Sequence, residues 1–84
     1  MTYAVFIRKS ARKTLARIAA PFQDRIIRAI RALANTPRPH GVKKLSGRDA
    51  WRIRVADFRI IYEIHDDRLV IVVVTIGRRG TVYR

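Results

Sequence analysis

The chain has 84 residues and no cysteine, so disulfide bonds, thiol nucleophiles and cysteine-based zinc sites are excluded. Hydrophobic residues make up 49% of the sequence, which allows a folded core, and the length allows one domain over residues 1–84. Lysine and arginine number 19 against 6 acidic residues, a formal net charge of +13, and 15 of the 19 are arginine. Such a chain is expected to bind polyanions, and the planar guanidinium group favours phosphate.

The N-terminal half predicts one strand followed by two helices. Residues 3–7 are aromatic and β-branched, as is typical of a strand, and this run is too short for a signal peptide or a membrane span. Ser10 is expected to cap a helix that runs from Ala11 toward Ala20. Pro21 suits the first turn of a second helix, in which apolar residues recur at helical spacing. We therefore expect a cytoplasmic protein with no membrane segment.

The C-terminal half predicts three further strands. Two prolines and a glycine within residues 37–41 end the second helix, and a basic connector covers residues 42–48. The strands are expected at residues 50–55, 58–65 and 69–76; residues 70–74 do not alternate, which is typical of a strand buried on both faces. This order predicts an α+β fold, with two N-terminal helices on one face of a mainly antiparallel four-stranded sheet and the other face open.

Residues 51–62 place three arginines on that open face. A turn at Ala56-Asp57 puts Arg54 directly opposite Arg59, and Arg52 shares their side by alternation. The pairs expected on the apolar side are Val55 with Phe58, Ile53 with Ile60 and Trp51 with Tyr62, the last pair being core rather than base-stacking residues. Like charges in directly opposed positions destabilise a hairpin by ~0.2–1 kcal/mol. The pattern therefore favours arginines gathered around a bound anion.

The other residues favour chemistry without a metal ion. His40 and His65 lack the spacing of a metal site, and no nucleotide-binding or zinc-protease motif is present. Glu63 is expected on the same side as Arg59, either as a charge partner of an arginine or as a proton acceptor. RNA cleavage suits such a surface, because the substrate supplies its own 2′-hydroxyl nucleophile. Guanidinium groups cannot act as bases, so Tyr83 is the candidate titrating group, its phenolate favoured by nearby arginines.

Three segments resemble RelE-type toxins of the RelE/ParE superfamily, and together the match spans essentially the whole chain. They are Trp51 to Tyr62, the preceding Pro37-Arg38-Pro39-x-Gly41-x-Lys43-Lys44-Leu45-x-Gly47, and Ile76-Gly77-Arg78-Arg79 followed by Val82-Tyr83. The resemblance implies a RelE-like fold and the toxin of a type II toxin-antitoxin pair. It also implies a ribosome-dependent endoribonuclease, or mRNA interferase, which cleaves mRNA in the A site and inhibits translation. A cognate antitoxin and the ribosome are then its partners, and no cofactor is expected.

By the same resemblance, five residues form the catalytic site: Arg52, Arg54, Arg59, Arg79 and Tyr83. The first three would hold and neutralise the scissile phosphate. Arg79 would stabilise or protonate the leaving side, and Tyr83 would orient or deprotonate the 2′-hydroxyl. Family members often have lysine where Arg52 and Arg54 stand, which leaves the acid/base assignment open because arginine does not transfer protons.

Four further basic residues are predicted to contact RNA: Lys43, Lys44, Arg48 and Arg78. Two other functions stay open. ParE-like members of the superfamily inhibit DNA gyrase through protein contacts and cut no RNA, whereas a small ribosomal or nucleoid protein would explain the charge but not the clustered arginines. The joint presence of Arg59, Arg79 and Tyr83 favours the ribonuclease.

Overall fold

The computed structural model describes residues 2–78, so the predicted site residues Arg79 and Tyr83 lie outside the described part of the chain. The elements in chain order are β1 (Ala4–Ile7), α1 (Lys9–Ala16), α2 (Ala20–Ala32), β2 (Lys43–Lys44), β3 (Trp51–Val55), β4 (Phe58–His65) and β5 (Val70–Arg78). Within residues 2–78, neither helix combines the length and the apolar character needed to cross a bilayer.

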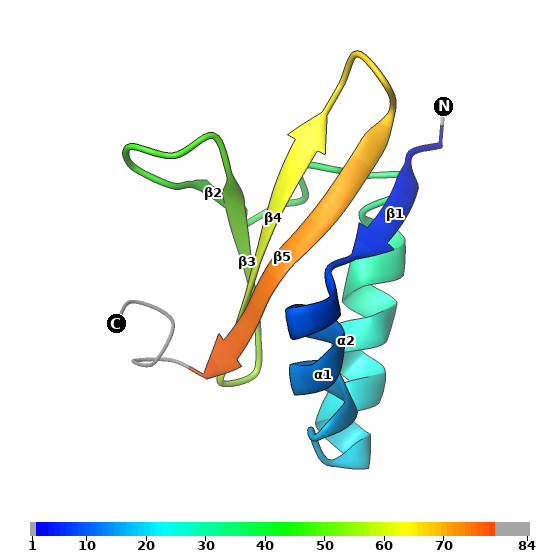
Figure 1. Cartoon of the computed structure of the whole chain (residues 1–84). Coiled ribbons are helices and arrows are strands. Elements are labelled where there is room, and N and C mark those ends of the chain that lie inside the picture. The colour runs from blue at the N-terminus through cyan, green and yellow to red at the C-terminus, as the bar shows by residue number, and fades with distance from the viewer. Residues whose placement is uncertain (1, 79–84) are drawn as a thin grey trace.

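The strands form one mixed sheet in the order β1-β5-β4-β3-β2. β1 runs parallel to β5, and the other neighbours are antiparallel. Both helices lie on the same face of this sheet (Figure 1). The predicted α+β fold is confirmed, but the sheet has five strands instead of four. The extra strand is β2, because Lys43 and Lys44, expected in a connector, pair with Arg52 and Trp51.

The core lies between the helices and the sheet. Ile60, Ile71 and Val73 of the sheet and Ile26 of α2 have no exposed surface. Fully burying a side chain of this size contributes ~1.5–3 kcal/mol, so these contacts fix the helices against the sheet. Helical spacing carries the buried stripe of α2 on to Ile30, while the arginines of that helix stay exposed.

The limits predicted for the first helix were wrong. α1 begins at Lys9 with Arg8 in the cap position, and no side chain caps it. Ser10 lies inside the helix, where its carbonyl accepts a hydrogen bond from the Thr14 hydroxyl at 3.2 Å. The helix ends at Ala16 rather than near residue 20. After it, the backbone N–H groups of Arg17 and Ile18 donate to carbonyls three residues earlier instead of four, which tightens the turn that leads into α2.

The prediction that the last strand is buried on both faces was also wrong. Ile71 and Val73 are buried against the helices, whereas Val70, Val72 and Val74 on the other side are only partly buried. The helices cover one face alone, so an unbroken run of β-branched residues does not require two covered faces.

Polar contacts around one carboxylate join the start of the chain to two loops, one between α2 and β2 and one between β4 and β5. Asp66 accepts hydrogen bonds from the Tyr3 hydroxyl at 2.6 Å and from Arg38 Nη2 at 2.9 Å. The Arg38 hydrogen bond, followed by that of Tyr3, lowers the pKa of Asp66. Arg38 also lies over the ring of Trp51, 4.9 Å from its centroid. We call Tyr3, Arg38 and Asp66 the Asp66 clasp. Through Arg38 it supports Trp51, the first residue of β3, which is followed directly by Arg52.

Candidate nucleic-acid interface

The β3-β4 hairpin has the register that the sequence predicts. Arg54 lies opposite Arg59, Arg52 lies opposite Ile61, and all three apolar pairs form. The apolar pairs face the helices, where Ile53 and Ile60 belong to the core. Because side chains alternate along a strand, the three arginines lie on the face that the helices leave uncovered. We call Arg52, Arg54 and Arg59 the arginine face.

The three arginines differ in their exposure. Arg54 is exposed and Arg52 is partly buried, but Arg59 retains only 7% of its exposed surface. The sequence predicted all three on an open surface, so the burial of Arg59 is a correction. The reason is that Arg59 has a paired residue on each side, Arg54 of β3 and Gly77 of β5, whereas β2 pairs only with Trp51 and Arg52 and does not reach Arg54. A charge with little water around it interacts more strongly with an anion that reaches it.

The two lysines of β2 point to opposite sides of the sheet. Lys43 pairs with Arg52 and therefore extends the arginine face. Lys44 pairs with Trp51 instead; its Nζ lies 5.3 Å from the centre of that ring and 3.1 Å from Asp49. Of these two predicted RNA contacts, only Lys43 lies beside the arginines.

Two other predicted RNA contacts lie away from the arginine face. Arg48 is exposed in the turn between β2 and β3. Arg78 pairs with Phe58, and its guanidinium carbon lies 5.2 Å from the centre of that ring. Phe58 faces the helices, so Arg78 lies on the opposite side of the sheet from Arg54 and Arg59.

Glu63 is engaged by its neighbours at the other end of β4. Its carboxylate accepts a hydrogen bond from Nε2 of His65 at 3.0 Å and lies 3.9 Å from the guanidinium group of Arg8. Glu63 lies four residue steps from Arg59 along the strand, a distance of about 13 Å. These contacts favour the charge-partner interpretation of Glu63 over a proton acceptor at the arginine face.

The described residues hold no cluster of histidine, aspartate or glutamate that could bind a metal ion. Of the predicted site residues, the structure brings Arg52, Arg54 and Arg59 together on one face and places Lys43 beside them. Arg79 and Tyr83, the other two predicted catalytic residues, fall beyond residue 78, where the description ends.

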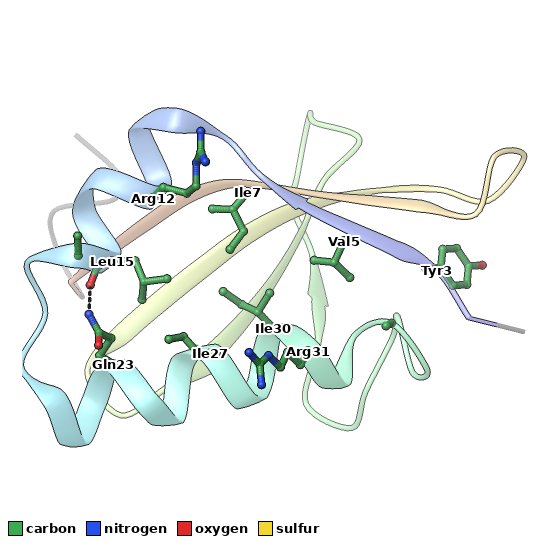
Figure 2. Close-up of a pocket in the computed structure, with 11 residues that line it drawn as sticks. Tyr3, Val5, Ile7, Arg12, Leu15, Gln23, Ile27, Ile30 and Arg31 are labelled. Carbon is green, nitrogen blue, oxygen red and sulfur yellow. Dashed lines mark hydrogen bonds between the residues drawn. The ribbon is translucent and has the colours of Figure 1, made fainter.

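Sequence reasoning missed an apolar groove on the helix side of the sheet. It has a volume of about 690 Å³ and lies between β1 and the two helices. Figure 2 shows Val5 and Ile7 of β1 pointing toward Ile27 and Ile30 of α2. Arg12 and Arg31 also line this groove, which we call the β1 groove. The signal for it in the sequence was the apolar first strand, residues 3–7.

The edge of the sheet beside the groove is unpaired in the described structure. β1 pairs with β5 alone; the backbone N–H of Ala4 donates to the carbonyl of Leu69, just before β5, and that of Arg8 donates to the carbonyl of Val73 in β5. By alternation, the peptide groups of Val5 and Ile7 point outward from the sheet. An extended peptide could therefore add a strand here and place alternate side chains in the β1 groove.

Known proteins share this architecture. A model of the ParE toxin of the type II toxin-antitoxin system parDE matches residues 5–83. A RelE-like toxin protein of Escherichia coli is 27% identical over 81 residues, covering 94% of this chain and 85% of that protein. The archaeal RelE of the RelE-RelB complex from Pyrococcus horikoshii superposes with a TM-score of 0.86 at 31% identity, covering 96% of this chain and 99% of that chain. The toxin-antitoxin complex RelBE2 of Mycobacterium tuberculosis shares the fold, with a TM-score of 0.82 at 20% identity over 94% of this chain and 100% of that chain. The chain therefore belongs to the ParE/RelE family of toxins from type II toxin-antitoxin systems.

Proposed function

We propose that this protein is a ribosome-dependent endoribonuclease that cleaves mRNA in the A site and thereby stops translation. The observation that carries the proposal is the direct opposition of Arg54 and Arg59 beside Arg52, with Arg59 almost fully buried. This arrangement costs folding free energy through like-charge repulsion. A phosphate bound between the arginines would turn that repulsion into attraction.

The reaction uses the 2′-hydroxyl of the RNA as its nucleophile. Its oxygen forms a bond to the scissile phosphorus while the bond from phosphorus to the 5′-oxygen of the next nucleotide breaks. One strand then ends in a 2′,3′-cyclic phosphate and the other begins with a 5′-hydroxyl. Negative charge grows on the phosphate oxygens during the step, and Arg54 and Arg59 are placed to neutralise it. A well-placed donor of this kind contributes ~2.7–4 kcal/mol to the transition state.

The proton transfers need groups other than the arginine face. Guanidinium holds its proton, so Arg52, Arg54 and Arg59 bind and neutralise charge without acting as bases. By resemblance to the family, Tyr83 removes the proton from the 2′-hydroxyl and Arg79 stabilises the leaving 5′-oxygen, which takes a proton from water to become the 5′-hydroxyl. No metal ion takes part in this scheme.

Mapping of mRNA 5′ ends in a translating extract tests this function. With wild-type protein we expect new ends at a fixed position within codons, and none in the absence of ribosomes. Tyr83→Phe and Arg79→Ala should each relieve growth arrest while leaving antitoxin binding intact. If both variants remain fully toxic, the assignment of these two residues is wrong. If the wild type produces no new ends, the proposed activity is wrong.

The cognate antitoxin is proposed to bind along the β1 groove. The relatives from P. horikoshii and M. tuberculosis form complexes with their antitoxins. Arg12 and Arg31 beside an apolar floor fit an acidic segment with aliphatic side chains.

We expect Arg31→Glu to weaken antitoxin binding at least about tenfold, since it reverses one charge at the groove. Arg28→Glu is the matched control, because Arg28 is an exposed arginine of the same helix and does not line the groove. Equal affinities of the two variants would place the antitoxin elsewhere.

DNA gyrase is the alternative target, because the matching family model describes the ParE toxin. A gyrase inhibitor acts by protein contacts and does not need a phosphate site on the arginine face. A supercoiling assay with purified gyrase distinguishes the two functions. Loss of supercoiling without new mRNA ends would select gyrase inhibition.

A further inference from the structure

A glycine lies inside β5 at a position where the backbone does not require one. Gly77 is next to last in this strand, whose other residues are mostly β-branched. Glycine weakens a strand, and inside one it marks a bulge or a place where a ligand or another backbone comes close. The register between β4 and β5 shifts between Ile61 and Tyr62, whereas the pairing at Gly77 is regular. The described glycines with a positive φ are Gly41 and Gly47. Close approach of a ligand or a backbone is therefore the reason that remains for Gly77.

Gly77 leaves one flank of Arg59 without a side chain. The two residues are directly paired, so a side chain at position 77 would project from the same face as Arg59, with its Cβ ~4.5–5.5 Å from that of Arg59. Arg54 occupies the matching position on the β3 side. Arg78, which follows Gly77, lies over the ring of Phe58 on the helix side of the sheet. On the β5 side, the arginine face is therefore bordered by bare backbone.

Arg59 lies low on the sheet, so a ligand must come close to the backbone to reach it. Only 7% of its surface is exposed. A phosphate within an RNA strand carries a ribose on each side, and these sugars must come close to the sheet together with the phosphate. On the β3 side the exposed side chain of Arg54 occupies the space above the strand. On the β5 side Gly77 leaves that space open to a sugar.

We propose that the RNA strand crosses β5 at Gly77, with a ribose next to the scissile phosphate in contact with the glycine backbone. Arg54 and Arg59 then hold the phosphate from the β3 side, and the ribose lies on the β5 side. This inference rests on the proposed function, because it takes the phosphate at Arg59 to be the one that is cut. The glycine sets how close the strand lies to the arginine face, and with it the alignment of the 2′-hydroxyl with the phosphorus.

Substitutions that place a side chain at position 77 test this inference. Gly77→Ala adds a methyl group and Gly77→Val adds an isopropyl group. We expect the alanine variant to cut ribosome-bound mRNA about tenfold more slowly and the valine variant about 100-fold more slowly, because a larger group holds the strand further from Arg59. Both variants should unfold at the same temperature as the wild type or at a higher one, since glycine is the least favourable of the three residues in a strand. A merely structural role of Gly77 would lower the unfolding temperature together with the rate.

Two controls separate the RNA strand from other effects of the substitutions. Val72→Ile adds a methylene group to the same strand and the same face, but opposite Glu63 instead of Arg59. We expect it to cut mRNA within about twofold of the wild-type rate. Inorganic phosphate is the second control, titrated while the side-chain N–H signal of Arg59 is followed by NMR. It carries no ribose, so Gly77→Ala should bind it within about twofold of the wild-type affinity.

The outcomes distinguish this inference from the proposed function. A Gly77→Val variant that cuts mRNA at the wild-type rate would overturn the inference, although cleavage itself would stand. Loss of phosphate binding in Gly77→Ala would also overturn it, since the glycine would then act on Arg59 and not on the RNA strand. Weaker antitoxin binding by Gly77→Ala with unchanged cleavage would assign the bare backbone to the antitoxin instead. Failure of the wild type to cut mRNA would refute the proposed function, and this inference with it.

Discussion

The two ends of the uncovered sheet face carry opposite arrangements of charge. At one end Arg54 lies opposite Arg59, two cations in directly paired positions. At the other end Glu63 lies between His65 and Arg8, so that the carboxylate has a partner on each side. Both ends lie on the same face of the same central strand, β4, so the difference does not come from the fold.

That difference separates charges arranged for stability from charges arranged for binding. The Glu63 end satisfies its own electrostatics, and nothing in its geometry calls for a ligand. At the arginine end two cations stand in directly opposed positions, an arrangement that costs ~0.2–1 kcal/mol in a small domain with a narrow margin of stability. We interpret the retained repulsion as the cost of a phosphate site.

The largest expected effect that separates the two ends is on cleavage. Arg59→Ala should slow cutting of ribosome-bound mRNA about 100-fold or more, because it removes the buried donor from the growing charge on the phosphate. Glu63→Gln should leave the rate within about twofold of wild type, since Glu63 lies about 13 Å from Arg59 along β4. Single-turnover rates on ribosomes stalled with an empty A site measure both.

Because Arg59 is buried, a second variant is needed to distinguish a lost phosphate contact from misfolding. Arg59→Lys keeps a positive charge at that position but loses the bidentate grip of guanidinium. We expect an intermediate rate for it. Equal rates for wild type, Arg59→Ala and Arg59→Lys would remove the arginine face from the reaction.

Sequence patterns predicted the arginine end almost completely. Alternation fixed which side chains share a face, and the turn at Ala56-Asp57 fixed the register, so Arg54 and Arg59 fell opposite each other as observed. Such local rules hold because a one-residue slip would expose the apolar partners Ile53 and Ile60. The family relationship indicated by the same segments is also confirmed.

The features that the sequence did not predict depend on contacts between distant parts of the chain. The burial of Arg59 follows from its having a paired residue on each side, on β3 and on β5, which local periodicity does not contain. β2 exists because two lysines find hydrogen-bond partners on β3, although lysine has no preference for strands. The β1 groove likewise requires the packing of helices against strands.

The next largest effect concerns the packing beneath the hairpin. Tyr62 has no exposed surface, and its hydroxyl donates to the Pro37 carbonyl at 2.7 Å. Burial raises its pKa to about 12. Since the folded pKa lies above the ordinary value near ~10, this contribution to stability is complete below pH ~10 and is lost as the pH rises toward 12. We expect a loss of up to ~2–3 kcal/mol from this group across that window.

Tyr62→Phe isolates this contribution. The variant should lose ~0.5–1.5 kcal/mol at neutral pH, because it gives up one hydrogen bond and leaves the Pro37 carbonyl without that donor. Its unfolding free energy should then fall less steeply between pH 10 and 12 than that of the wild type. Urea denaturation at a series of pH values measures both, and parallel pH curves would contradict the role of the Tyr62 phenol.

A smaller effect is expected at acid pH from the Asp66 clasp. The hydrogen bond from Arg38, and then that from Tyr3, lowers the pKa of Asp66. A carboxyl group with a lowered folded pKa stabilises the protein above its unfolded pKa, and that stability is lost as the pH falls through the folded value. Asp66→Asn should therefore flatten the acid limb of the stability curve. Asp67→Asn is the control, being the neighbouring exposed carboxylate, and an identical curve for both variants would contradict the clasp.

The smallest effect tests the comparison itself, because it concerns stability at the two ends of the sheet face. Arg54→Thr should raise the unfolding free energy by ~0.2–1 kcal/mol, since it removes the repulsion across from Arg59 and places a good strand former on β3. Glu63→Gln should shift it the other way, since it removes the negative partner of His65 and Arg8. Added salt should reduce the difference in unfolding free energy between Arg54→Thr and the wild type, because ions screen the exposed guanidinium of Arg54. A stabilised Arg54→Thr variant that cuts mRNA poorly would show that the repulsion serves binding; a destabilised one would mean that the two arginines already share an anionic partner within the folded chain.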